Sequence, residues 1–115
     1  MTPEDLRTAI ALGREQRSTE FKGPGMRTDK ALLVKVIRAM LGMANKPDGG
    51  VVVLGVEDSG ATITATGLSP AELATWGYDD LASSVSNYAD PYIEFDVTVV
   101  NLDGNQFVAA EISGG

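Results

Sequence analysis

Residues 44–60 read Ala-Asn-Lys-Pro-Asp-Gly-Gly-Val-Val-Val-Leu-Gly-Val-Glu-Asp-Ser-Gly, and this stretch decides the fold. It holds an aliphatic run, residues 51–56, that only Gly55 interrupts and that turn-forming residues bound on both sides. Such a run cannot leave one face in water without exposing several large apolar side chains, so it predicts a central strand covered on both faces. The carboxylates of Glu57 and Asp58 are then expected where this strand ends.

The segments next to this strand have their own periodicities. Residues 28–45 have the apolar spacing of a long helix, with Thr28 as its expected N-terminal cap, and residues 47–50 end that helix. Residues 61–66 alternate between apolar and polar side chains, so they are expected to pair antiparallel with the central strand. Residues 19–22 also alternate, which places Phe21 inside and leaves Glu20 and Lys22 together on the open face.

The rest of the chain predicts further helices and strands. A helix capped by Thr2 is expected to run from Pro3 to Gly13, and a capping box at residues 69–72 opens a short helical turn. Residues 78–89 predict a helix that Asp90-Pro91 stops, and residues 92–102 and 107–112 predict a hairpin closed by Asp103-Gly104. The side chains expected inside are Leu81, Val85, Tyr88, Ile93, Phe95, Val97 and Val99, and Trp76 is expected in the core or as a surface lid on it.

This order of elements indicates a mixed α/β fold, of the α+β kind, with helices packed against a central mixed sheet of about five strands. A chain of 115 residues with 43% hydrophobic and 22% charged residues is long and apolar enough for one globular domain, which we place at residues 1–115. There is no apolar stretch of the roughly 20 residues that cross a bilayer and no signal-peptide pattern. We therefore expect a cytoplasmic protein that does not enter a membrane.

Residue usage limits the chemistry. The chain has no cysteine and no histidine, which excludes disulfides, thiolate catalysis, histidine acid–base catalysis and nearly every zinc site. A bound metal would need oxygen ligands, which favours Mg²⁺ or Mn²⁺ (or Ca²⁺) over zinc. The glycines at positions 23, 25, 49 and 50 match neither the P-loop nor the dinucleotide fingerprint.

Charge is distributed unevenly along the chain. The net charge is −7, but all nine basic residues lie in the first 46 positions, which carry +4, while the remaining residues carry −11. One face built from the first 46 residues can therefore be positive although the whole chain is acidic. The alternative is that both halves are ordinary solvated surface.

Three segments taken together resemble the Schlafen AlbA-type domain, a family often described as DNA-binding. They are Glu-x4-Glu-Phe-Lys at residues 15–22, Ala-Asn-x3-Gly-Gly at residues 44–50, and Val-Leu-Gly-Val-Glu-Asp at residues 53–58. The order of the elements that follow also resembles this family, so the resemblance covers nearly the whole chain. It implies a mixed α/β domain that handles nucleic acid.

In the branch of the Schlafen family that cleaves RNA, three carboxylates form a metal-dependent nuclease site. Carried over by position, the resemblance implies Glu15, Glu20 and Asp58 as catalytic and metal-binding residues. Carboxylates that converge on Mg²⁺ or Mn²⁺ suit phosphodiester hydrolysis, and Lys22 can stabilise the developing charge. Glu57 is the competing ligand if the strand register differs by one. The structural alternative is that Glu20 pairs with Lys22 or Arg17 and that Asp58 caps its turn.

The chain departs from the vertebrate members, which carry two such lobes and a zinc site of Cys and His. A single lobe can form a homodimer or bind without cutting. Many bacterial members join this domain to a carboxy-terminal region of transcription-regulator or ATP-binding character, so we expect the chain to be a fragment of a longer protein.

Three functions follow as hypotheses. The first is binding of RNA or DNA through phosphates, with the contacts expected from Arg14, Arg17, Lys22, Arg27, Lys30 and Lys46. The second is a divalent-metal endoribonuclease that uses Glu15, Glu20 and Asp58. The third is an oligomerisation or regulatory module of a larger protein, for which the acidic second half would be the contact surface.

Overall fold

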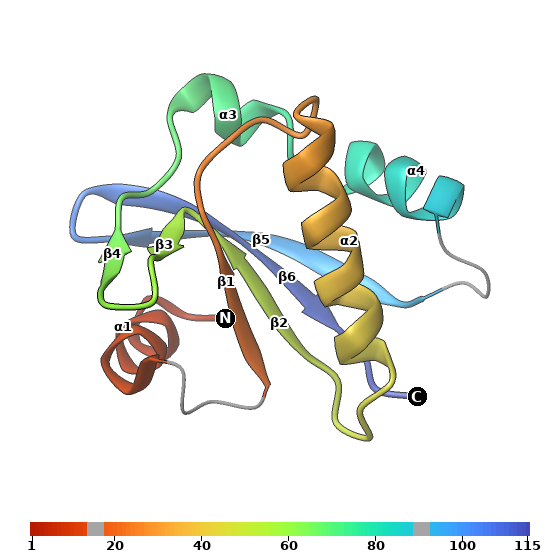
Figure 1. Cartoon of the computed structure of the whole chain (residues 1–115), viewed down its shortest axis with the longest axis horizontal. Coiled ribbons are helices and arrows are strands. Elements are labelled where there is room, and N and C mark those ends of the chain that lie inside the picture. The colour runs from red at the N-terminus through yellow and green to blue at the C-terminus, as the bar shows by residue number, and fades with distance from the viewer. Residues whose placement is uncertain (14–17, 89–92) are drawn as a thin grey trace.

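A mixed four-stranded sheet forms the centre of the molecule (Figure 1). This computed structural model describes residues 1–13, 18–88 and 93–115. The helices are α1 (Pro3–Leu12), α2 (Lys30–Ala44), α3 (Pro70–Ala74) and α4 (Tyr78–Tyr88). The strands are β1 (Thr19–Lys22), β2 (Gly50–Leu54), β3 (Val56–Asp58), β4 (Ile63–Ala65), β5 (Phe95–Leu102) and β6 (Asn105–Ile112). Within the described ranges, every helix is too short or too polar to span a membrane.

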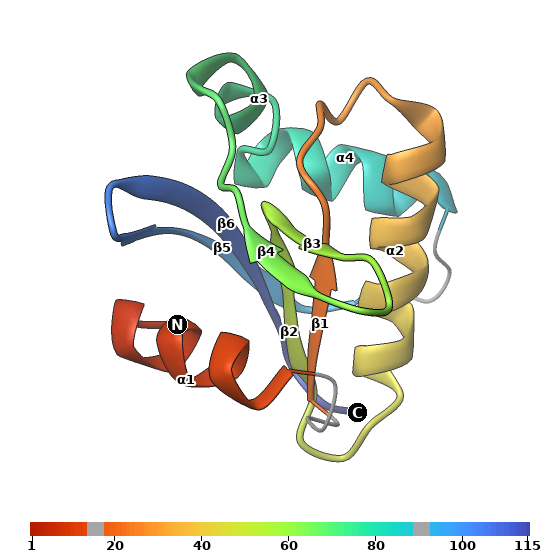
Figure 2. The ribbon, with the colours of Figure 1, turned by 60° about the vertical axis from the view of Figure 1, so that its left-hand side comes forward.

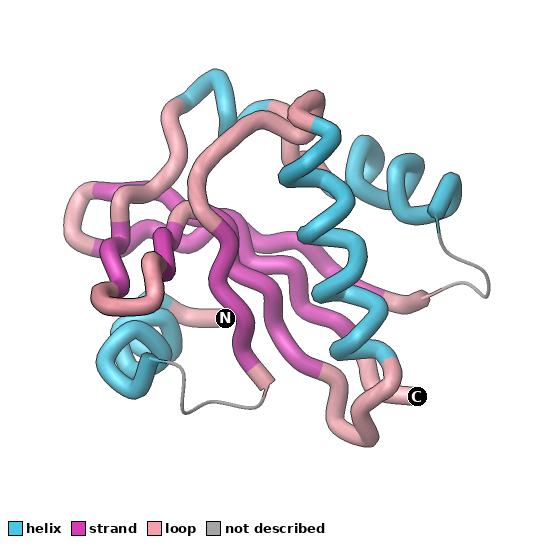
Figure 3. The backbone as a smooth tube through the Cα atoms, in the orientation of Figure 1, coloured by secondary structure: helices cyan, strands magenta, loops and turns pink. Residues whose placement is uncertain are grey.

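The strands of the central sheet follow the order β1-β2-β6-β5. β1 runs parallel to β2, with Glu20 opposite Val52, whereas β6 runs antiparallel to both β2 and β5. α2 makes the crossover from β1 to β2, and β3 and β4 form a separate antiparallel ribbon (magenta strands in Figure 3). The predicted α+β class with a mixed sheet is confirmed. Of the strands described, four lie in this sheet and two in the ribbon, where about five in one sheet were expected.

Helices cover both faces of the sheet. α2 and α4 lie on one face and α1 on the other (Figure 2). On the α2 side, Val52 and Leu54 belong to an apolar cluster that includes Trp76, while Val53 belongs to a second cluster with Leu6. All three strand residues are fully buried, which contributes roughly 1.5–3 kcal/mol for each side chain. The prediction that this strand is covered on both faces is confirmed.

The aliphatic run is nevertheless divided between two strands. Gly55 has a φ of 106°, and its backbone N–H donates to the carbonyl of Lys22 while its own carbonyl accepts from the N–H of Gly67. The chain therefore leaves the central sheet after Leu54 and starts β3 at Val56. The expected antiparallel hairpin forms between β3 and β4, so the prediction that residues 61–66 pair with the central strand is wrong.

The helix ends follow the polar residues at their borders. Ser69 forms the predicted capping box, Thr2 is the predicted cap of α1 and also forms a capping box, with Asp5, and Gly13 ends α1 with a φ of 61°. The predicted cap of α2 is wrong by one residue, because Asp29 takes this position instead of Thr28. The Asp29 carboxylate accepts hydrogen bonds from two backbone N–H groups of the first helical turn, which leaves the Thr28 hydroxyl no such role.

The second half of the chain contributes Trp76, Leu81 and Val85 to the core, as predicted. Tyr88 was expected inside but is 54% exposed, because it is the last residue of α4 and lies beyond the turns that pack on the sheet. The predicted helix stop at Asp90-Pro91 and the first residue of the predicted strand, Tyr92, lie outside the described residues.

The β5–β6 hairpin closes at Asp103-Gly104, both with positive φ, as the sequence predicts. Val99 was expected inside with Phe95 but is 52% exposed. Along β5, the buried side chains change face from Phe95, which packs under α4, to Val100 and Leu102, which pack near α1. Val99 lies on the same face as Phe95, at a position along β5 that α2 and α4 do not cover.

Candidate functional site

A groove runs between the edge strand β1 and helix α2. It consists of three hollows in a row. The central hollow shares Glu20, Met43 and Lys46 with the first hollow, beside the turn after α2, and it shares Lys22 and Lys35 with the third hollow, at the carboxyl end of β1. We call this continuous surface the basic groove. Its central hollow has a volume of about 350 Å³.

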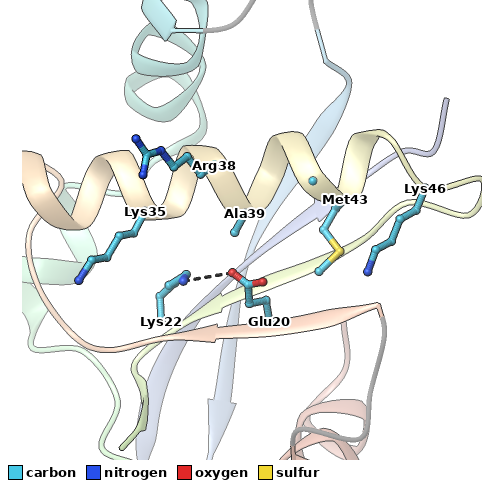
Figure 4. A pocket seen from close by; sticks show the side chains of 8 residues that line it. Glu20, Lys22, Lys35, Arg38, Ala39, Met43 and Lys46 are labelled. Carbon is cyan, nitrogen blue, oxygen red and sulfur yellow. Dashed lines mark ion pairs between the residues drawn. The ribbon is translucent and has the colours of Figure 1, made fainter.

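Four cationic side chains border the central hollow: Lys22, Lys35, Arg38 and Lys46. Lys35, Arg38 and Lys46 project from α2 and the turn after it, and Lys22 comes from the facing strand (Figure 4). Glu20 lies among them, with its carboxylate 3.1 Å from the ammonium of Lys22. This ion pair is the one that the structural alternative for Glu20 predicts. It is partly open to solvent, so its own contribution to stability is small.

The local sequence explains this arrangement. Side chains alternate along β1, so Phe21 packs against the apolar cluster on the α1 side while Glu20 and Lys22 face α2. On α2, positions 35, 38, 39 and 42 lie on one side of the helix at spacings of three and four residues. Ala39 and Gly42 are the small residues of that side, and a Cβ added to Gly42 would meet nothing within 4 Å. The hollow is therefore the space that these two small residues leave between the cations.

The third hollow lies at the carboxyl end of β1 and contains acidic side chains. Glu57, Asp58 and Asp29 line it together with Lys22 and Lys35. Asp58 accepts a hydrogen bond from the N–H of Gly60 at 3.0 Å, as expected for a residue that caps its turn. Glu57 lies so close to Gly23 that a Cβ at position 23 would be 2.5 Å from its Oε1 atom.

Of the three carboxylates that the resemblance implies, the structure describes two, and these two line different hollows. Glu20 lines the first two hollows and Asp58 the third, while Glu15 lies outside the described residues. Among residues 1–13, 18–88 and 93–115, no group of three acidic side chains is close enough to hold a metal ion. The described residues therefore do not supply a complete ligand set by themselves, and the three-carboxylate site stays a prediction.

The basic residues named from the sequence take different positions. Lys22 and Lys46 line the basic groove, Arg14 and Arg17 lie outside the described residues, and Lys30 does not border the three hollows.

The Arg27 side chain forms hydrogen bonds within the fold. Its Nε donates to the carbonyl of Thr75 at 3.0 Å and its Nη1 donates to the hydroxyl of Ser84 at 2.9 Å. The guanidinium therefore connects the loop after β1 to α3 and α4, and it does not lie along the basic groove.

Lys35 and Arg38 border the central hollow but were not among the candidates chosen from the sequence. In the sequence, both lie opposite the apolar side chains of the helix, where charged residues are usually only solvated. One sequence feature could have identified Lys35 and Arg38 as candidates: they lie near the small residue Ala39 on the helix that connects two parallel strands. A parallel crossover returns its helix over the preceding strand, and that strand carries Lys22.

Comparison with known proteins identifies the family. The family described as Schlafen, AlbA_2 matches residues 15–115. Several solved structures share the fold, and two of them are described here. The DIP2311 protein from Corynebacterium diphtheriae has a TM-score of 0.62 at 20% identity, over 97% of this chain and 25% of that one.

The second solved structure is the N-terminal domain of a protein from Nitrosomonas europaea described as related to the ATP-dependent DNA helicase RecG. It has a TM-score of 0.59 at 16% identity, over 100% of this chain and 74% of that one. The present chain thus spans a quarter of the DIP2311 chain and about three quarters of the other. No curated protein matches it. Because the family match covers all but the first fourteen residues, the chain belongs to the Schlafen AlbA_2 family.

Proposed function

We propose that this domain binds nucleic acid, RNA or DNA, by placing the phosphate backbone along the basic groove. The observation that carries the proposal is that Lys22, Lys35, Arg38 and Lys46 all line one hollow in a chain of net charge −7. Lysine and arginine side chains neutralise phosphates and release counterions, which supplies most of the affinity in sequence-independent binding.

The overall acidity of the chain does not oppose this binding strongly. At physiological salt, charges farther apart than about 8 Å are largely screened, so a phosphate in the groove responds mainly to the nearest side chains. Those are four cations and Glu20 in the central hollow. The acidic residues of the third hollow make that end of the groove the less favourable one for a phosphate.

The composition of the groove favours contacts to the backbone over contacts to bases. In the described part of the chain, the two hollows around Glu20 contain no aromatic side chain, and Phe21 in the third packs toward the core. Stacking on aromatic rings is the usual way to hold unpaired bases. Family membership and the name of the helicase-related neighbour agree with a role on nucleic acid.

A second candidate function is cleavage of RNA. It is favoured by the position of Glu20, whose carboxylate lies among the cations that would hold a phosphate. In this hypothesis, Glu20 acts with Asp58 and Glu15 to hold Mg²⁺ or Mn²⁺, and Lys22 stabilises charge on the scissile phosphate. The metal would supply Lewis-acid polarisation of the phosphoryl oxygen.

The experiment compares transfer RNA and duplex DNA as ligands, each in Mn²⁺ and in chelator. Wild type is compared with Lys35→Ala plus Arg38→Ala, and with Arg7→Ala plus Lys30→Ala, which removes two cations outside the groove. We expect only the groove variant to lose affinity, by roughly tenfold or more at physiological salt. Equal affinity in both double variants would exclude the groove as the binding surface.

The same samples test cleavage. Products that appear only in Mn²⁺, and that Glu20→Ala plus Asp58→Ala abolishes, would establish the nuclease. Retarded but intact nucleic acid with both proteins would show that the domain binds without cutting.

A further inference from the structure

The two edges of the central sheet differ in how they are protected. Edge strands expose unpaired backbone groups, and natural proteins protect them by keeping them short or by adding charges, prolines or bulges. β1 has four residues, two of them charged. β5 has eight residues, Phe-Asp-Val-Thr-Val-Val-Asn-Leu, with one charge and no Lys, Arg, Pro or Gly. It pairs with β6 without a bulge over its whole length.

The backbone groups that β5 presents to the outside can be assigned. The N–H of Ser113 donates to the carbonyl of Glu94, so residue 94 points toward β6. The direction of the backbone N–H and C=O groups alternates along a strand. These groups therefore point toward β6 in the even-numbered residues of β5 and away from β6 in the odd-numbered residues. The other end agrees, because Leu102 and Asn105 flank the two-residue turn. The outer edge therefore presents the N–H and C=O groups of Phe95, Val97, Val99 and Asn101.

Exposed apolar side chains lie beside this edge. Val99 is 52% exposed and Tyr78 is 41% exposed, and both are among the large apolar residues on the surface of the described chain. The Tyr78 ring lies 5.2 Å from the ring of Phe95, centroid to centroid. Phe95, Val97 and Val99 alternate onto one face, where Phe95 is buried, Val97 is half-buried and Val99 is exposed, so Val97, Val99 and Tyr78 leave an apolar strip beside the first half of β5. The first half of β5 therefore has both outward-pointing backbone groups and exposed apolar side chains beside them.

We propose that a second copy of this chain pairs with β5, antiparallel across a twofold axis at Thr98, so that two four-stranded sheets become one of eight strands. In this register Val97 lies opposite Val99 of the partner subunit, and both are residues with outward backbone groups. Thr98 lies opposite its own copy as a non-hydrogen-bonded pair. The register pairs residues 95–101 of each copy, more than registers centred farther from the middle of the strand.

The sequence of β5 favours a second copy as the occupant, because this strand can pair with itself without placing like charges opposite each other. The only charged residue of β5 is Asp96, and the proposed register places it opposite Val100 of the partner subunit. No like charges face each other, and valine and threonine pairs across strands are favourable. β5 and β1 are opposite edges of the sheet, so the dimer leaves both basic grooves open. The proposal is therefore independent of the nucleic-acid function.

Mass in solution tests the proposal first. We expect the wild type to be a dimer by sedimentation or light scattering, with dissociation on dilution over about a hundredfold range. Val99→Pro removes an N–H that points away from β6 and has no partner among the residues that the structure describes, so this variant should be a folded monomer. Val99→Lys is the second variant and should also be a monomer. Leu12→Lys, at an exposed apolar residue of α1, is the matched control and should remain dimeric.

A crosslink tests the register. Because the chain has no cysteine, Thr98→Cys introduces one thiol, and the pair on the axis would have a Cα–Cα distance of about 4.5 Å, suitable for a disulfide. Thr98→Cys should form a covalent dimer at least about tenfold faster than Thr64→Cys, an exposed control in β4. The proposal is overturned if the wild type is monomeric at every concentration, if both Val99 variants stay dimeric, or if the two cysteine variants crosslink equally.

Discussion

The variant Arg27→Ala tests whether Arg27 stabilises the fold or contacts nucleic acid. The sequence suggests a phosphate contact, whereas the structure shows its guanidinium donating to the Thr75 carbonyl and the Ser84 hydroxyl. Arg27→Ala removes both bonds. It leaves the backbone N–H of residue 27, which donates to the Thr75 hydroxyl at 2.9 Å. The loop keeps one more contact to this region, from the indole N–H of Trp76 to the carbonyl of Gly25.

The magnitude follows from these contacts. Hydrogen bonds from a charged group contribute about 1.5–3 kcal/mol each when buried, but this site is half-buried and Ser84 keeps its bond to the Asp80 carbonyl. We therefore expect Arg27→Ala to lower the free energy of unfolding by about 2 kcal/mol. For a domain of this size, that corresponds to a decrease in Tm of about 8 °C.

The assay is thermal unfolding followed by circular dichroism, with Lys30→Ala as the control for removing a basic residue. Lys30 is exposed, and its removal should change the Tm by less than about 2 °C. Below the melting range, Arg27→Ala should bind nucleic acid as wild type does. A Tm unchanged by Arg27→Ala, together with a loss of binding, would refute the structural role.

Three further predictions concern a turn, an acidic cap and the carboxylate in the groove. Gly55→Ala should lower the stability by about 2 kcal/mol in denaturant unfolding, because φ is 106° and a Cβ would lie 2.9 Å from Phe107, whereas the control Gly42→Ala should raise it by about 0.5–1 kcal/mol. Hydrogen bonds from the backbone N–H and the hydroxyl of Thr2 lower the pKa of Asp5, so its ionised form stabilises the fold above the unfolded-state pKa and this effect is lost as pH falls through the folded-state value. Melting of Asp5→Asn should therefore depend less on pH below about 4 than melting of wild type. Glu20→Gln should tighten nucleic-acid binding about twofold to fivefold in filter-binding assays with chelator present, because it removes a negative charge from the central hollow.

Much of the fold follows from local patterns. The aliphatic run at residues 51–56, the capping residues Thr2 and Ser69, and the Asp103-Gly104 turn each determine a local structure without help from distant residues. The structure confirms the covered strand, the two caps and the turn.

The remaining features depend on tertiary contacts. Gly55 leaves the sheet because its backbone is bonded to Lys22 and Gly67, residues that periodicity does not connect to it. Val99 has the alternation of a buried residue but lies where no helix covers the sheet. For the site, the sequence identified Glu20 and Lys22, whereas Lys35 and Arg38 depend on where α2 lies relative to β1. The outward edge of β5 likewise depends on the strand order.

The most direct test of the account is the salt dependence of nucleic-acid binding. Each phosphate neutralised on duplex DNA contributes about −0.9 to the slope of log K against log salt, so four groove cations predict a slope of up to about −3.6. Lys35→Ala plus Arg38→Ala should reduce the magnitude of the slope by about 2, whereas Arg7→Ala plus Lys30→Ala should leave it unchanged. A wild-type slope near zero, or equal slopes in the two double variants, would contradict binding through the basic groove.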